Sequence, residues 1–181
     1  VTGSGIGSNQ NATITEPALS FTPIAPGTGV VPLSAVLSAG ASTQVLAGFA
    51  VSSTGTQTIS QFNFNYTPST SVTTEYIYKN TTPGTLVGAT IVDTDGSPDG
   101  TFNNGATLAE VVTTSTVYYY LLVDVDASVT SSTTAITPTL SQTSITKDIG
   151  TVNAFSFNRS YTFNTSQNST IVLNGGTTDN I

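Results

Sequence analysis

The sequence Thr-Val-Tyr-Tyr-Tyr-Leu-Leu-Val-Asp-Val-Asp-Ala, residues 116–127, decides the fold of this chain. In an extended strand, successive side chains point to opposite faces, so residues two apart share a face. One face carries Val117, Tyr119, Leu121, Val123 and Val125, and the other carries Tyr118, Tyr120, Leu122, Asp124 and Asp126. The first face is apolar throughout, and the second is apolar until Asp124. This pattern predicts a central strand of a β-sandwich, with one face buried and the other partly covered.

Short segments of the same kind follow one another along the chain, separated by Gly, Pro, Asn and Asp. We expect strands over residues 33–38, 43–53, 58–66, 72–79, 85–92, 106–113, 133–140, 144–147, 152–163 and 169–173. Gly48 lies inside the second of these segments and indicates a bulge or a close backbone approach. About ten short strands in a row predict an all-β, antiparallel β-sandwich, either immunoglobulin-like or of the jelly-roll kind.

The chain divides into an N-terminal segment, residues 1–32, and a single β-sandwich domain, residues 33–181. The start of the segment is rich in Gly and Ser, which predicts a flexible leader. Prolines interrupt the part that follows and confine any strand there to the edge of a sheet. The chain begins with Val1 rather than Met. We therefore expect a mature chain that has lost a signal peptide, or an excised fragment.

The composition argues against several classes of function. Lys and Arg total 3 against 10 Asp and Glu, which gives a formal net charge of −7. Nucleic acids and anionic membranes bind through Lys and Arg, so neither is an expected partner. The chain has no Cys and no His, so disulfides, thiol chemistry and the commonest general base are excluded. No apolar run approaches the ~20 residues of a transmembrane helix.

The sequence does not predict an enzyme. Catalysis by paired carboxylates needs two acids that face one cleft. Glu75 and Glu110 are the Glu residues inside predicted strands, and nothing in the sequence brings them together. A Ser nucleophile would lack a His base, and no Gly-x-Ser-x-Gly motif is present.

Two further stretches have a familiar form. One is Val-Leu-Ala-Gly-Phe-Ala-Val-Ser-Ser at residues 45–53, followed by Ile-Ser-Gln-Phe-Asn-Phe at 59–64; the other is the Tyr-rich stretch at 113–130, which contains Asp-Val-Asp-Ala. Together they resemble immunoglobulin-like β-sandwich modules of large secreted and cell-surface proteins of Bacteroidetes-type bacteria. The resemblance covers roughly residues 33–140. It implies an extracellular location and a structural or adhesive role, and it implies no catalytic residues.

One loop has the composition of a cation site. Asp93, Asp95, Ser97 and Asp99 place an oxygen ligand at every second position, with a Gly after the second Asp, as at the start of a calcium loop. Position 12 is Asn104 rather than the bidentate Glu of such loops. The alternative is an Asp-Gly turn between two strands of a hairpin. Calcium is thus the one cofactor that the sequence suggests.

Asp124 and Asp126 lie two apart at the end of the Tyr-rich strand and form a weaker candidate for a second oxygen cluster. The alternative is that they mark where a buried strand reaches solvent. A glycan is a possible ligand if strand tyrosines form an exposed patch, although strand tyrosines are more often half-buried. These tyrosines are Tyr76, Tyr78, Tyr118 and Tyr120. Asn-x-Ser/Thr sequons, which are candidate glycosylation sites, occur at Asn11, Asn65, Asn80, Asn158, Asn164 and Asn168.

The segment at residues 11–24 allows two structures. It is either the first edge strand of its own domain, or a donor strand that completes the sandwich of a neighbouring copy through Leu19, Phe21 and Ile24. Head-to-tail donation would build an open filament. The sequence therefore suggests a non-enzymatic subunit of a pilus-like surface filament that self-associates through this segment. The alternative is an adhesin or carbohydrate-binding module of a larger secreted protein.

Overall fold

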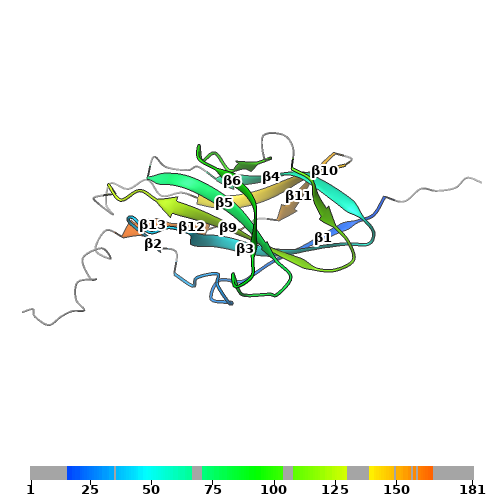
Figure 1. Cartoon of the computed structure of the whole chain (residues 1–181), viewed down its shortest axis with the longest axis horizontal. Helices are drawn as coiled ribbons and strands as arrows, with labels where there is room; N and C mark the ends of the chain where they lie inside the picture. Colours follow the sequence, from blue (N-terminus) through cyan, green and yellow to red (C-terminus); the bar gives the residue numbers. More distant parts are fainter. Residues whose placement is uncertain are drawn as a thin grey trace, which may run out of the picture.

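The chain folds as an all-β sandwich (Figure 1). The computed structural model describes residues 16–34, 36–66, 71–103, 108–129, 139–148, 150–155, 157 and 159–164. Within these residues the strands are β1 (Leu19–Pro23), β2 (Val36–Ser38), β3 (Gln44–Ser53), β4 (Gln57–Tyr66), β5 (Val72–Asn80), β6 (Thr90–Asp95), β7 (Thr101–Phe102), β8 (Glu110–Val112), β9 (Val117–Val125), β10 (Thr139–Lys147), β11 (Thr151–Phe155), β12 (Arg159–Ser160) and β13 (Thr162–Asn164). None of the described segments is a helix that could cross a membrane.

Strand β9 lies in the middle of the first sheet, whose order is β1-β3-β9-β5-β6. All four pairings in this sheet are antiparallel. The inward face of β9 packs into the main core, and Tyr120 and Leu122 on its outward face are buried as well. The prediction of a central strand at residues 116–127, with one face buried and the other partly covered, is therefore confirmed.

The second sheet has the order β11-β10-β4-β7, with β8 also paired to β4 and β12 to β10. Its pairings are antiparallel too. A separate two-stranded pair joins β13 to β2 in parallel, which the expectation of antiparallel pairing alone did not include. There are thirteen described strands rather than about ten, because several pairings involve only two or three residues.

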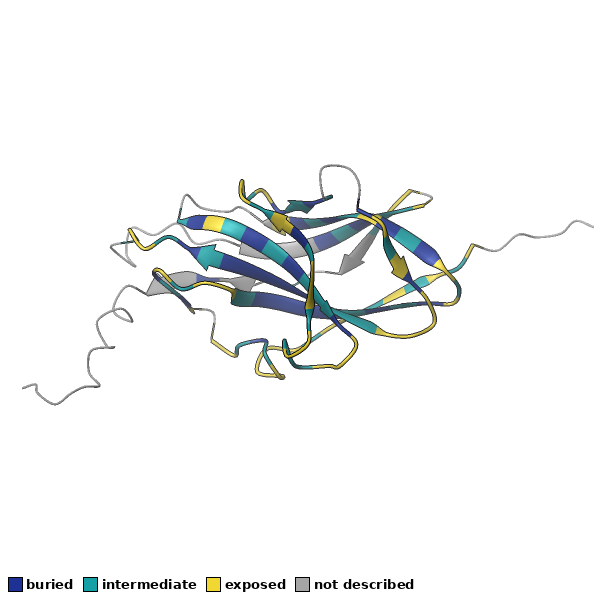
Figure 2. Cartoon of the chain, viewed as in Figure 1, coloured by how far each residue is buried: buried dark blue, intermediate teal, exposed yellow. Residues whose placement is uncertain are grey.

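The main core fills the space between the two sheets. Phe49 of β3 stacks on Tyr119 of β9, with ring centroids 5.6 Å apart, and meets Phe62 of β4 edge to face at 6.0 Å. Burial of such rings removes a large apolar area from water, and their mutual contacts add to it. Figure 2 shows the buried positions along β3, β5 and β9.

A second, smaller cluster covers the outer face of the first sheet. Residues 24–31, which we call the connector, cross this face after β1, and Ile24 and Val31 pack there against Tyr120. A Cβ placed on Gly48 of β3 would lie 2.9 Å from Tyr120 Cδ1 and from Val31 Cγ2. The close approach that Gly48 indicated is thus the connector packing over β3.

Several element boundaries differ from the sequence expectation. The strand expected at residues 85–92 is β6, at Thr90–Asp95, because residues 82–89 form turns with positive φ at Gly84 and Gly88. We expected Asp93 and Asp95 to lie in a polar loop, and this prediction is wrong, because both residues belong to β6. The strand expected at 106–113 is the short β8. The strand expected at 169–173 lies outside the described residues.

Candidate functional site

Strand β1 forms one edge of the first sheet, and among the described strands it pairs with β3 alone. The register runs from Leu19 opposite Ser53 to Pro23 opposite Phe49. Leu19 and Phe21 are half-buried and pack against the main core. In this structure β1 is therefore the edge strand of its own domain, one of the two arrangements that the sequence allowed. Its apolar side chains fill the position that a donor strand from a neighbour would fill.

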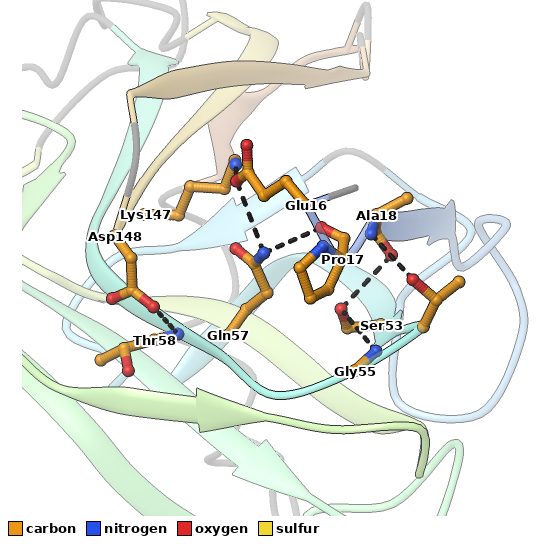
Figure 3. Close-up of polar contacts among 10 residues, drawn as sticks. Glu16, Pro17, Ala18, Ser53, Gly55, Gln57, Thr58, Lys147 and Asp148 are labelled. Atoms are coloured by element: carbon orange, nitrogen blue, oxygen red, sulfur yellow. Dashed lines mark hydrogen bonds and ion pairs between the residues drawn. The ribbon is translucent and has the colours of Figure 1, made fainter. Parts of the chain in front are cut away.

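Polar contacts hold the start of β1 against the ends of β3 and β4 (Figure 3). The backbone N–H of Ala18 donates to Thr54 Oγ1 at 2.9 Å, and the N–H of Thr54 donates to the carbonyl of Ala18 at 3.0 Å. Gln57 Nε2 donates to the carbonyl of Pro17 at 2.8 Å. We call these contacts, with the ion pair described next, the N-terminal clamp.

An ion pair completes the N-terminal clamp. Lys147, at the end of β10, pairs with Glu16. The Lys147 side chain is only 9% exposed, whereas that of Glu16 is 38% exposed. A buried ammonium that loses its carboxylate is strongly destabilising, because the charge is left without hydration or a partner. Glu16, which precedes β1, therefore balances a charge that is largely covered at this edge of the sandwich.

The connector that follows β1 is loosely packed underneath. A cavity of about 240 Å³ lies between it and β3, and its lining is mostly apolar: Pro23, Ile24, Ala25, Pro26, Val31, Leu46, Ala47 and Phe157. Pro23 has no N–H to donate, and the next hydrogen bond is from Ile24 N to Gly48 O at 2.8 Å. The connector thus contacts the sheet at few points between its two ends.

Three carboxylates meet at the end of the sandwich opposite to the N-terminal clamp. Glu75 of β5, Asp95 of β6 and Asp99 of the following turn each offer an oxygen within 4.8 Å of the other two. The pairing of β5 with β6 causes this, because it places Glu75 directly opposite Asp95. We call these three residues the carboxylate cluster. Sequence reasoning placed Asp95 and Asp99 in a site but did not place Glu75 with them.

Glu75 is fully buried between the sheets. Its Oε1 accepts hydrogen bonds from the N–H groups of Asp99, at 3.1 Å, and Gly100, at 2.8 Å. Burial raises the pKa of Glu75 from 4.5 to about 7, although these two hydrogen bonds oppose the shift; Asp95 and Asp99 raise it further. At neutral pH this carboxyl group is therefore poised between its neutral and charged forms.

Of the other predicted cation ligands, Ser97 contacts the carboxylate cluster through its N–H, whereas Asp93, Asp124 and Asp126 are not part of the cluster. Asp93 is buried and accepts a hydrogen bond from Thr94 N, and Ser97 N donates to Asp95 Oδ1. Asp124 accepts from Thr43 N at 2.7 Å through one oxygen and from the Tyr76 hydroxyl at 2.6 Å through the other. Asp126 is partly exposed and accepts from Ser128 N, and this bonding lowers its pKa.

Glu110 lies elsewhere in the sandwich. Its carboxylate accepts from Lys79 Nζ at 2.7 and 2.9 Å and from the Tyr119 hydroxyl at 3.1 Å. Burial, and then the nearby Glu110 charge, raise the pKa of Tyr119. These contacts join β5, β8 and β9 and give Glu110 a packing role.

The four strand tyrosines do not form one exposed patch. Tyr120 is fully buried, and its hydroxyl accepts a hydrogen bond from Gly84 N at 2.8 Å. Tyr76 and Tyr78 are half-buried, with ring centroids 6.0 Å apart. Tyr118 lines a groove of about 730 Å³ between the connector and the turn at Pro83. The tyrosines are therefore mainly packing residues, as strand tyrosines often are.

The sequons differ in their surroundings. Asn65 is exposed on β4. Asn80 is buried, and its amide donates to the carbonyls of Thr85 and Val87 at 3.0 Å each. Both amide hydrogens of Asn80 are thus already used, which disfavours it as a glycan acceptor. Asn164 ends β13, and the remaining candidates lie outside the described residues: Asn11, Asn158 and Asn168.

Comparison with protein-family models and with curated proteins gave no match. The resemblance to Bacteroidetes-type modules therefore stays a prediction. The functional proposals below are based on the geometry of this chain alone.

Proposed function

We propose that this chain is a non-enzymatic, extracellular structural subunit that self-assembles into a pilus-like surface filament by exchange of β1. The observation that carries this proposal is the pairing of β1 with one strand only, at a sheet edge. Such a strand can leave its own domain without breaking any other pairing, and an identical strand from a neighbour can replace it.

The chemistry of the vacated edge favours replacement over loss. Without β1, the outer backbone groups of β3 lose their partners, and Lys147 loses Glu16. Unpaired backbone groups and a buried unpaired charge are both costly. A second copy of the chain supplies the same ladder and the same acid, so exchange restores every contact of the N-terminal clamp.

The connector sets how far β1 can reach toward a neighbour. Its eight residues span at most about 29 Å when extended. The cavity beneath it and the proline at the end of β1 reduce the contacts that must be broken, and the packing of Ile24 and Val31 against Tyr120 is what exchange has to release. Exchange of this kind is heterologous, so it produces an open chain of subunits unless a rotation closes a ring.

Engineered disulfides test the exchange, because the chain has no native Cys. Ser20 lies directly opposite Ser52 across the β1–β3 pairing, and opposed residues in antiparallel strands are about 4.5–5.5 Å apart, within disulfide range. Two single variants, Ser20→Cys and Ser52→Cys, are mixed, refolded together and oxidised mildly. In exchanged subunits the two cysteines face each other, so we expect a disulfide-linked heterodimer.

The matched control replaces Ser20→Cys with Val87→Cys, because Val87 is exposed and lies outside the β1–β3 pairing. This mixture should give only the background of random disulfides. The double variant Ser20→Cys/Ser52→Cys should give a ladder of covalent multimers and filaments by negative-stain microscopy. If the double variant instead forms only an intramolecular disulfide and no filament is seen, the proposal is wrong.

A second candidate function is an adhesin or carbohydrate-binding module. The observation that favours it is the groove lined by Tyr118, Pro83 and Gly84 on the outer face of the first sheet. An aromatic ring beside a groove is a surface on which a sugar ring can stack. A glycan array separates the two functions, because a filament subunit without ligand should bind no glycan selectively. Selective binding that Tyr118→Ala removes would support the adhesin.

A further inference from the structure

The turn between β6 and β7 connects the two sheets. Strand β6 belongs to the first sheet and β7 to the second. Gly100, in the turn, donates its N–H to Glu75 of β5 at 2.8 Å and accepts from Phe64 N of β4, also at 2.8 Å. The carboxylate cluster therefore lies where one turn is bonded to both layers of the sandwich.

We propose that Glu75, Asp95 and Asp99 bind a calcium ion that joins the two sheets at this end of the molecule. Calcium binds oxygen ligands at about 2.3–2.6 Å, so two of its ligands lie at most about 5 Å apart. The three carboxylate oxygens meet this condition, because they all lie within 4.8 Å of one another. Magnesium, at about 2.1 Å, requires a tighter cluster.

The Glu75 carboxylate provides independent support for a ligand. Its Oε1 accepts two backbone hydrogen bonds, whereas its Oε2 is buried and has no hydrogen-bond partner among the residues that the structure describes. A buried, unpaired carboxylate oxygen is rare in native proteins, since it loses hydration without compensation. A cation between Glu75 and the two aspartates supplies the missing partner.

The charge balance at the cluster points the same way. Three carboxylates lie together, while both lysines of the chain are paired elsewhere, Lys79 with Glu110 and Lys147 with Glu16. Asp95 and Asp99 each use one oxygen, Oδ1, to accept a backbone N–H within the turn. Their Oδ2 atoms accept no hydrogen bond from the described residues, so they are available to a metal.

The arrangement differs from the calcium loop suggested by sequence spacing. The ligands come from β5, β6 and the turn rather than from one continuous loop, and Asp93 is not among them. Asp99 is exposed, so water completes the coordination shell on that side. A site with three carboxylates and several waters has a modest affinity, with Kd of about 10⁻⁴ M, as in extracellular modules.

Thermal unfolding of the full chain tests the proposal. Protein stripped with EDTA is compared with protein in 10 mM CaCl₂ at pH 8, with ionic strength matched by NaCl. At about 100 times Kd, calcium should raise the Tm by about 5–10 °C. Terbium luminescence provides a second measurement, because tyrosine sensitises bound Tb³⁺, and calcium should displace it. An unchanged Tm and no displaceable terbium signal would overturn the proposal.

Two variants separate calcium binding from a packing role. Glu75→Gln keeps an oxygen for the N–H groups of Asp99 and Gly100 but removes the charge, so its Tm should no longer rise with calcium. In EDTA its Tm should equal or exceed that of the wild type. The control Asp126→Asn removes a partly exposed carboxylate outside the cluster and should keep the full calcium response. The same response in all three proteins would mean non-specific salt effects only, and the proposal would fail.

If Glu75→Gln does not fold, Asp99→Asn gives the same test, because Asp99 is exposed and its side chain is not part of the core. Loss of the calcium-dependent rise in Tm in this variant supports the site. A full rise in Asp99→Asn, together with a full rise in Asp126→Asn, contradicts it.

Discussion

Substitution of Gly48 by alanine should loosen the connector without touching β1 itself. Gly48 is buried in the middle of β3, under Ile24 and Val31 of the connector. An added Cβ would lie 2.9 Å from Tyr120 Cδ1 and Val31 Cγ2, and 3.0 Å from Ile24 Cδ1. Since ordinary contacts begin near 3.4 Å, the methyl group must displace the connector or the Tyr120 ring.

The size of the effect follows from two opposing contributions. Overpacking a well-filled site costs about 1–3 kcal/mol. The loss of glycine flexibility in the unfolded chain stabilises the variant by about 0.4–1 kcal/mol. We therefore expect Gly48→Ala to lower the free energy of unfolding by about 1–2 kcal/mol, which lowers the Tm by about 2–8 °C.

The assay is urea unfolding followed by circular dichroism, together with the Ser20/Ser52 cross-linking experiment. A matched control is Gly96→Ala, because a Cβ at Gly96 meets nothing within 4 Å. This control should lie within about 0.5 kcal/mol of the wild type. Gly48→Ala should also increase the yield of cross-linked heterodimer, since a displaced connector releases β1 more easily. A stability equal to that of Gly96→Ala would refute the packing of the connector over β3.

Three other perturbations have defined outcomes. A chain that lacks residues 1–24 should aggregate, because Lys147 and β3 lose their partners. A synthetic peptide of residues 16–24 should restore a monomeric species that melts cooperatively. Failure of the peptide to do so would count against an exchangeable β1. In EDTA, the free energy of unfolding should fall by up to about 3 kcal/mol as the pH rises from 4.5 to about 7. The reason is that the buried Glu75 holds a proton over this range that the unfolded chain releases. In Glu75→Gln, thermal melts should not show this fall of stability with pH. Asn80→Ala should lower the free energy of unfolding by about 2–3 kcal/mol, because the Asn80 side chain makes three hydrogen bonds to nearby backbone groups. Urea unfolding of this variant and of the exposed control Asn65→Ala measures the loss.

The parts of the fold that sequence could predict are those that depend on local alternation. The apolar alternation at residues 116–127 identifies β9 as central, and the prolines around residues 17–26 confine β1 to an edge. Gly48 marks a close approach, although the sequence does not say of what. Each of these inferences uses a property of one short segment, so no knowledge of strand pairing was needed.

The carboxylate cluster could not be predicted, because it depends on the register between two strands. Glu75 joins Asp95 only because β5 and β6 pair with those residues opposite each other. One signal was present: Glu75 shares the inward face of its strand with the buried Ile77. A charged residue at an inward position needs a partner. The sequence alone does not say which residue lies opposite Glu75, so it could not identify that partner. The N-terminal clamp was missed similarly, since Lys147 and Glu16 are distant in the chain.

The position of β9 also determines when the sandwich can form. Strands β3 and β5 both pair with β9, and the residues of β3 lie roughly 70 positions earlier in the chain than their partners. Until β9 is available, the facing edges of β3 and β5 have no partner to complete the first sheet. The β1–β3 and β5–β6 pairings do not involve β9, so β9 is the strand that joins the two halves of the first sheet, and we expect these non-local pairings to make folding slow.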